Sequence, residues 1–451
     1  MPTSLRYVMP DSTINLEKYR KAVTAAKPVR LQGKVTQVVG LVIEGYCPDT
    51  SVGATCEIKP LEGEPIPAEV VGFRNNKTLL MPLGELRGVG LDSLISVRRD
   101  KASMGVGPLM LGRVIDGLGQ PIDGRGPLHT EEEYPIYAAP VNPMLRPPIR
   151  RPLDLGIRSI NGLLTCGQGQ RVGIMAGSGV GKSTLLGMIA RYTEADVNVI
   201  ALIGERGREL REFIEKDLQE QGLQKSVVVV ATSDQPPLVR MRGAYIAVTI
   251  AEYFQKQGKK VLLMMDSATR FAMAMREVGL AIGEPPTTKG YTPSVFAALP
   301  KLLERSGNFA DGSITGLYTV LVEGDDFNEP ISDAMRSILD GHIVLSRELA
   351  SRNIYPPVDV LASASRVMSD VTSVEHQKYA GRFKELMATY RQSEDLINIG
   401  AYKSGSNHGI DYAISKHEGM QAFLKQAIHD PVSVNDAILG LRSLFDGQAG
   451  G

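Results

Sequence analysis

The chain has 451 residues, which is too long for one ordinary hydrophobic core and predicts about three domains. Its 50 Lys and Arg residues balance 50 Asp and Glu residues, and this balance disfavours a protein built mainly to coat nucleic acid. The hydrophobic content is ordinary, and no apolar run approaches 18 residues, which argues against a membrane-spanning helix. The first residues form no apolar leader, which argues against a secreted chain. The three cysteines are widely spread, which argues against a disulfide framework and fits a reducing cytosol.

Residues 1–28 are predicted to form a short helical appendage. Its apolar residues at helical spacing are Leu16, Tyr19 and Val23. The stretch from Lys18 to Lys27 is locally basic, and two interpretations remain open for it. It is either a solvated helix face, or a helix that docks on a partner or on an anionic membrane surface.

The next segment, residues 29–99, changes character. Short β-rich runs are separated by Gly, Pro and Asn-Asn breaks, and this pattern predicts a small all-β barrel. Residues 100–150 combine the glycine-rich stretch GRVIDGLGQPIDGRGPL with a run of prolines, and such a density of turn residues predicts a connector between domains.

From residue 151 to 365 apolar strands alternate with helical stretches, which predicts a mostly parallel sheet covered on both faces. The predicted strands are 171–176, 197–203, 226–231, 260–266, 314–322 and 342–345. The predicted helices between them are 182–195, 207–221, 238–257, 267–281 and 332–340. Residues 366–451 are predicted to form a helical C-terminal domain, with helices at 371–397, 411–428 and 432–446.

The strongest motif is the loop AGSGVGKST between the first of these strands and a helix. Its glycines allow backbone N–H groups to surround phosphate oxygens, Lys182 reaches the β- and γ-phosphates of ATP, and Ser183 ligates Mg2+. The predicted nucleotide-binding residues are Gly177, Ser178, Gly179, Val180, Gly181, Lys182, Ser183 and Thr184. The first position departs from the motif, because Ala176 stands where glycine is usual. A turn that binds nothing is the alternative, and a dinucleotide fingerprint fits worse because its third glycine falls on Lys182.

A second element of the site is Asp266, the last residue of the apolar run VLLMMD. A carboxylate at the end of a strand in the same α/β unit can hold Mg2+ through water. The alternative is that Asp266 caps the helix 267–281, and the two roles are compatible.

A third element is the stretch GERGRE directly after the strand 197–203. Ligands bind at the carboxyl ends of parallel strands, so Glu205 is placed to polarise an attacking water. Arg206 is placed to hold the γ-phosphate or to orient that carboxylate. A surface ion-pair cluster of small energetic value is the alternative.

With these motifs in this order, the chain resembles the F1/V-type and type III secretion group of hexameric ATPases, and within it the flagellar export branch. The resemblance covers nearly the whole chain. It rests on GRVIDGLGQPIDGRGPL, AGSGVGKSTLL, GERGRE, VLLMMDSATRF, LDGHIVLSR, NIYPPVDVLASASRV and EDLINIGAY. It implies a RecA-like P-loop NTPase core between an N-terminal β-barrel and a C-terminal helical domain, and a homohexamer with nucleotide between neighbours.

The resemblance also implies roles for single residues. Glu205 matches the family's catalytic glutamate, and Arg206 matches the arginine beside it near the γ-phosphate. Tyr355 in NIYPPVDV matches the ring that packs on adenine; an ordinary half-buried tyrosine is the alternative. Arg366 in ASASRVMS matches the arginine finger that acts on the nucleotide of the neighbouring subunit; a surface arginine in a salt bridge is the alternative.

The function that the resemblance implies is ATP hydrolysis that energises flagellar type III protein export. The enzyme would be cytoplasmic and peripheral, at the inner face of the bacterial cytoplasmic membrane beside the export gate proteins. The ATPase of a virulence type III secretion system is the alternative. The implied partners are chaperone–substrate complexes, a coiled-coil central stalk protein, and a stator-like regulator or acidic phospholipid at the N-terminal helix.

Two further segments are less informative. Residues 276–294 carry several glycines and prolines and are predicted to form a loop too irregular for a core element, whereas in the family this region lines the central channel. The acidic loop 323–326 is interpreted either as solvated or as a switch near the site.

Two other classes of protein share the nucleotide-binding core. A nucleic-acid-translocating ring of the termination-factor type would need basic and aromatic residues across its barrel, but only Tyr46 and Phe73 are aromatic between residues 29 and 99. A non-catalytic ring subunit is disfavoured by the presence of Lys182, Glu205 and Arg366. We therefore predict an ATPase that does not bind nucleic acid.

Overall fold

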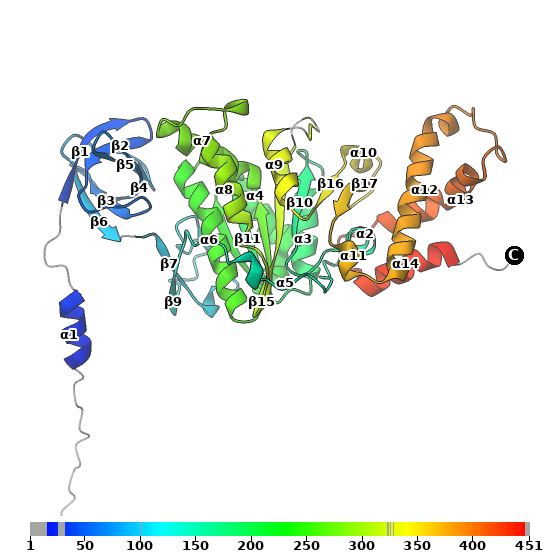
Figure 1. Cartoon of the computed structure of the whole chain (residues 1–451), viewed down its shortest axis with the longest axis horizontal. Coiled ribbons are helices and arrows are strands. Elements are labelled where there is room, and N and C mark those ends of the chain that lie inside the picture. Colours follow the sequence, from blue (N-terminus) through cyan, green and yellow to red (C-terminus); the bar gives the residue numbers. More distant parts are fainter. Residues whose placement is uncertain are drawn as a thin grey trace, which may run out of the picture.

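A computed structural model describes residues 16–25, 32–99, 101–322, 324, 326–327 and 329–446. The molecule is elongated, with a small barrel at one end, a sheet flanked by helices in the middle and a helical domain at the other end (Figure 1). This arrangement confirms the predicted fold class. In the described ranges, no helix has the length and apolar character needed to cross a membrane.

The N-terminal helix and the barrel come first. Helix α1 (Leu16–Ala25) lies within the predicted appendage, whereas Lys27 falls outside the described residues. Six antiparallel strands then close a barrel in the order β1-β2-β5-β4-β3-β6. They are β1 (Gln32–Val39), β2 (Val42–Tyr46), β3 (Thr55–Lys59), β4 (Ile66–Arg74), β5 (Lys77–Pro82) and β6 (Leu94–Arg99). Asn75 and Asn76 both have positive φ at the β4–β5 hairpin, a conformation that asparagine tolerates in tight turns.

The segment predicted as a connector is more than a linker. Strands β7 (Ser103–Val106) and β9 (Glu132–Pro135) pair with each other, and β8 (Val114–Asp116) joins the central sheet beside β12. The prediction missed this edge strand because three residues in a glycine-rich stretch leave no readable periodicity. Sheet hydrogen bonds between β8 and β12 therefore attach the connector to the central domain.

The central sheet has the order β17-β16-β10-β15-β13-β11-β12-β8. Its main strands are β10 (Arg171–Ala176), β11 (Val197–Ile203), β12 (Ser226–Ala231), β13 (Lys260–Asp266), β15 (Gly312–Leu321) and β16 (Gly341–Leu345). They are parallel, and all six were predicted to within two residues. The antiparallel strands β17 (Val358–Ser365) and β14 (Gly307–Phe309) were not predicted.

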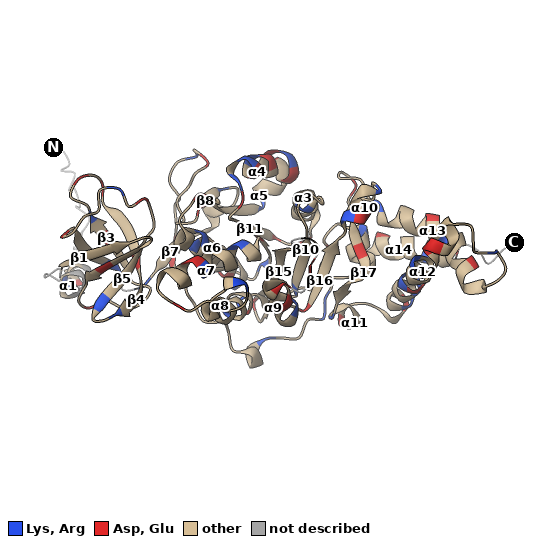
Figure 2. Ribbon diagram, turned by 90° about the horizontal axis from the view of Figure 1, so that it is seen from above, with Lys and Arg blue, Asp and Glu red and all other residues tan. Residues whose placement is uncertain are grey.

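Helices cover both faces of this sheet (Figure 1). They include α2 (Arg158–Leu163), α3 (Lys182–Tyr192), α4 (Gly207–Glu212), α5 (Gln219–Gln224), α6 (Pro237–Lys256), α7 (Ala268–Ala281), α8 (Pro293–Leu303), α9 (Pro330–Ile338) and α10 (Arg347–Ser351). A π-helix (Phe213–Leu218) links α4 to α5. Arg and Glu residues alternate along α4 (Figure 2), as expected for a solvated face.

The prediction of an irregular loop over 276–294 was wrong at both ends. Helix α7 continues to Ala281, and Tyr291 and Thr292 are buried where the chain enters α8. The Tyr291 ring packs edge-on against Phe296 and lies under the Arg276 guanidinium. In the acidic loop 323–326, residues 323 and 325 lie outside the described residues.

The C-terminal domain is helical. It contains α11 (Met368–Val371), α12 (Val374–Asn398), α13 (His408–Leu424) and α14 (Val434–Asp446). Phe383, Phe423 and Leu441 are buried in the same hydrophobic core as Leu163 of α2. The helical domain thus shares a core with the elements that lead into the nucleotide-binding strand β10.

Candidate nucleotide-binding and hydrolysis site

The phosphate-binding loop runs from the end of β10 to the start of α3. Gly179 and Gly181 have φ of 76° and 87°, a left-handed conformation that glycine adopts without strain. Ala176, the departure from the usual motif, is buried as the last residue of β10 and pairs with Leu321 and Leu345 on either side. Because its backbone is ordinary strand, alanine is accommodated there.

Two carboxylates converge on Lys182 at the carboxyl edge of the sheet. The Lys182 ammonium pairs with the Asp266 carboxylate and lies 3.5 Å from Glu205 Oε1. Asp266 ends β13 and Glu205 follows the adjacent strand β11, so the strand order brings the two acids together. Thr319 of β15, which the sequence analysis missed, donates its hydroxyl hydrogen to Asp266 Oδ1 at 2.7 Å.

Burial and charge shift the ionisation of this cluster. Burial disfavours the charged form of Lys182, but the attraction of Asp266 and Glu205 outweighs it and raises the pKa of Lys182. Burial also raises the pKa of Glu205, and the Lys182 ammonium offsets only part of that shift. The arrangement keeps a cation where phosphates would bind and places a proton-accepting carboxylate beside it.

Ser183 and Thr184 lie in the first turn of α3, and Ser183 is exposed. A second missed residue is Asp217, in the π-helix between α4 and α5; burial raises the pKa of its carboxyl group, and the nearby Thr184 hydroxyl offsets part of that shift. The carbonyl oxygen of Asp217 also accepts a hydrogen bond from the Arg191 guanidinium of α3. The π-helix thus holds the helix that follows the phosphate-binding loop.

Tyr355 lies beside the phosphate-binding loop, on the loop between α10 and β17. A methyl group at Gly181 would contact the Tyr355 ring at 3.4 Å, and Tyr355 as a whole is 43% exposed. The ring faces a cavity of about 210 Å³. The cavity is lined by Gly181, Thr184, Leu185, Met188, Tyr355, Pro356, Pro357, Gln426 and Ile428. The sequence analysis missed Gln426 and Ile428 because they come from the C-terminal domain, far away in the chain.

Two predicted residues lie outside this cluster. Arg206 precedes α4, and its side chain is 81% exposed and lies 3.4 Å from Glu209. Arg366 follows β17, which runs antiparallel to β16 with Ser365 opposite Gly341. Because the phosphate-binding loop lies at the other end of these strands, strand rise places Arg366 on the order of 15 Å from it.

The fold and the site define a P-loop nucleotide-hydrolysing enzyme with a RecA-like core. Residues 156–365 match the nucleotide-binding domain of the ATP synthase alpha/beta family, and residues 372–443 match the T3SS EscN ATPase C-terminal domain. The chain belongs to the ATP synthase alpha/beta family, in the branch of flagellar and type III secretion ATPases.

Full-length relatives support this assignment. The flagellum-specific ATP synthase of Bacillus subtilis (strain 168) is 55% identical over 91% of this chain and 94% of that protein. The assembled ATPase EscN from the enteropathogenic E. coli type III secretion system is 48% identical, with a TM-score of 0.87 over 91% of this chain and 99% of that chain. EscN in complex with its central stalk EscO gives 47% identity, a TM-score of 0.85 and the same coverage. These relatives confirm the predicted flagellar-type ATPase.

Proposed function

We propose that six copies of this chain form a ring that hydrolyses MgATP between neighbouring subunits and energises flagellar protein export. The enzyme works in the cytoplasm, against the inner face of the membrane. One observation supports a catalytic site shared between two subunits. Lys182, Glu205 and Asp266 meet within one chain, whereas Arg366 lies at the opposite edge of the sheet. The assembled state of EscN, which is similar over 91% of this chain, supports the ring.

Each side chain then has a distinct task in hydrolysis. The glycine loop surrounds the phosphates, and Lys182 holds the β- and γ-phosphate oxygens. Glu205 accepts a hydrogen bond from the attacking water and draws off its proton as the water oxygen bonds to the γ-phosphorus. The bond from that phosphorus to the β-phosphate oxygen breaks, and Arg366 of the neighbour neutralises the charge on the transferring group. In this scheme Arg206 turns from Glu209 toward the γ-phosphate.

The residues present fit a magnesium ion. Ser183 offers an exposed hydroxyl, and Asp266 offers a carboxylate held in place by Thr319. Oxygen ligands of this kind, one or two from the protein with the rest from phosphates and water, are those that Mg2+ prefers. When bound, the ion would neutralise charge on the β- and γ-phosphates.

The N-terminal helix supports the docking interpretation of the appendage. Leu16, Tyr19 and Val23, which share one face of α1, are all exposed. A stator-like regulator with an apolar helix would cover this face, and acidic phospholipid is the competing occupant. A coiled-coil stalk in the ring follows the precedent of EscN with EscO. Export gate proteins and chaperone–substrate complexes remain part of the proposal.

The shared-site model predicts that specific ATPase activity rises with protein concentration. Below the assembly concentration each chain lacks the neighbour's Arg366, so activity per chain should fall steeply on dilution. The measurement is phosphate release against protein concentration, with Mg2+ and with a chelator as control, together with sizing at each concentration. A flat, appreciable rate from a chain that sizes as a monomer would contradict the proposal.

Replacing Tyr355 by alanine is predicted to raise the KM for ATP about ten-fold and to leave kcat within about two-fold, because a base–aromatic stack contributes about 1–3 kcal/mol. The variant Tyr355→Phe keeps the ring and serves as the control. Steady-state kinetics of both variants check this, and an unchanged KM in the alanine variant would remove the adenine-stacking role.

A further inference from the structure

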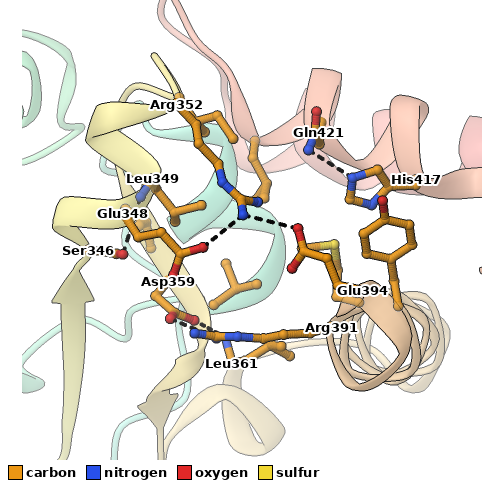
Figure 3. Close-up of a pocket in the computed structure, with 16 residues that line it drawn as sticks. Ser346, Glu348, Leu349, Arg352, Asp359, Leu361, Arg391, Glu394, His417 and Gln421 are labelled. Carbon is orange, nitrogen blue, oxygen red and sulfur yellow. Dashed lines mark hydrogen bonds and ion pairs between the residues drawn. The ribbon is translucent and has the colours of Figure 1, made fainter. Parts of the chain in front are cut away.

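The loop that carries Tyr355 is bracketed by two ion pairs that end on one helix. Before the loop, Arg352 NH2 lies 3.0 Å from Glu394 Oε1. After it, Asp359 Oδ2 lies 3.0 Å from Arg391 NH1. Residues 391 and 394 are three positions apart on α12, so they present neighbouring side chains on one face of that helix. Figure 3 shows both pairs reaching from α12 to the nucleotide-binding domain.

The ends of both pairs on the nucleotide-binding domain are themselves fixed. Arg352 also pairs with Glu348 of α10 at 3.1 Å. The other oxygen of Asp359 accepts hydrogen bonds from the backbone N–H groups of Leu361 and Ala362, each at 3.0 Å. The carboxylates of Asp359 and Glu394 are only 13% and 22% exposed, so solvent screens these pairs less than fully open ones.

The space between the two ion pairs belongs to the contact between the two domains and is not a ligand site. It encloses about 60 Å³, enough for a few water molecules and too little for a nucleotide. Its apolar lining includes Leu349, Ile354, Val360, Met387 and Leu424, from both sides of the domain boundary. The ion pairs therefore brace an apolar contact between α12 and the strand that follows the Tyr355 loop.

A third tie runs from the C-terminal domain to Tyr355 itself. The backbone N–H of Gln426 donates to the Tyr355 carbonyl at 2.9 Å. The backbone at Tyr355 is thus held by the C-terminal domain as well as by the nucleotide-binding domain.

We propose that Arg391 and Glu394 are positioning residues that hold the Tyr355 loop against the phosphate-binding loop, so that the placement of α12 sets the affinity for ATP. This inference rests on the proposed adenine role of Tyr355. It assigns to two charged residues of the C-terminal domain, which do not line the cavity beside Tyr355, a direct influence on the nucleotide site.

The first test compares Arg391→Gln, Glu394→Gln and the double variant with wild type. Each single variant is expected to raise the KM for ATP about three-fold, and the double variant about ten-fold, which corresponds to about 1.4 kcal/mol. The value of kcat should stay within about two-fold, because the phosphate site is untouched. Arg391→Lys keeps the charge and should restore most of the affinity. The matched control is Glu385→Gln, an exposed acid on the same helix that makes no ion pair among the described residues.

The second test repeats the double variant in a Tyr355→Ala background. If the pairs act through Tyr355, the double variant should raise KM no further there, a non-additivity expected of coupled residues. An additional ten-fold rise in that background would overturn the inference, as would an unchanged KM in the double variant alone while Tyr355→Ala is impaired. An unchanged KM in Tyr355→Ala would instead remove the adenine role and, with it, the route assigned to Arg391 and Glu394. Thermal unfolding and sizing of every variant confirm that folded rings are compared.

Discussion

Replacing Glu205 by glutamine is expected to lower ATP turnover by about 10³-fold while nucleotide binding stays within about two-fold. Glutamine has nearly the same shape, so Lys182 and the glycine loop keep their positions. The amide cannot accept the proton of the attacking water, and it removes the partly buried charge that would orient that water. Glu205 suits the role because its backbone is fixed at the end of β11, where its carbonyl accepts a hydrogen bond from the Ser233 N–H at 3.0 Å.

Single-turnover hydrolysis and equilibrium binding of a fluorescent ATP analogue, both with Mg2+, measure the two quantities separately. The matched control is Glu212→Gln on α4, whose carboxylate is half exposed and pairs with Arg208 and Lys216 at the surface. That variant should hydrolyse ATP at the wild-type rate. Wild-type turnover in Glu205→Gln would exclude Glu205 from the chemistry, and loss of binding would mean that its charge holds the site together.

The strands of the central sheet were predictable because burial on both faces requires apolar residues at nearly every position of a strand. Every residue of β11 is buried, and a strand covered on both faces appears in the sequence as a nearly continuous apolar run, interrupted in β11 by Asn198. The strand order then follows from the fold, and it places Glu205 and Asp266 side by side. The phosphate-binding loop was predictable for a different reason, since strand, glycines, lysine and helix are contiguous in the chain.

Contacts between distant segments were not predictable from local pattern. Thr319 sits in an apolar strand, and its hydrogen bond to Asp266 depends on the pairing of β15 with β13. Strand β8 pairs with β12 across more than one hundred residues of chain and is too short to show a period. Gln426 and Ile428 reach the Tyr355 cavity only because the helical domain folds back on the nucleotide-binding domain.

Replacing Arg366 by alanine is expected to reduce turnover of assembled rings by about 10³-fold or more, the usual effect of removing an arginine finger. Within its own chain Arg366 cannot act on the nucleotide, because β17 delivers it to the edge of the sheet opposite the phosphate-binding loop. Its guanidinium donates a hydrogen bond to the Arg336 carbonyl at 3.4 Å and the residue is exposed, so it is available to a neighbour. Arg366→Lys keeps the charge but loses the planar fork and should be intermediate.

Mixing two inactive proteins tests whether this contribution crosses the subunit boundary. Lys182→Ala subunits lack phosphate binding but keep Arg366, whereas Arg366→Ala subunits have the reverse defect. In a randomly mixed ring with head-to-tail interfaces, about one site in four combines an intact Lys182 with a neighbour's intact Arg366. Activity should therefore return on mixing, with no activity in either protein alone. Rings shown by sizing to be mixed but still inactive would place Arg366 outside the neighbour's site, whereas recovery requires that one subunit completes the catalytic site of the next.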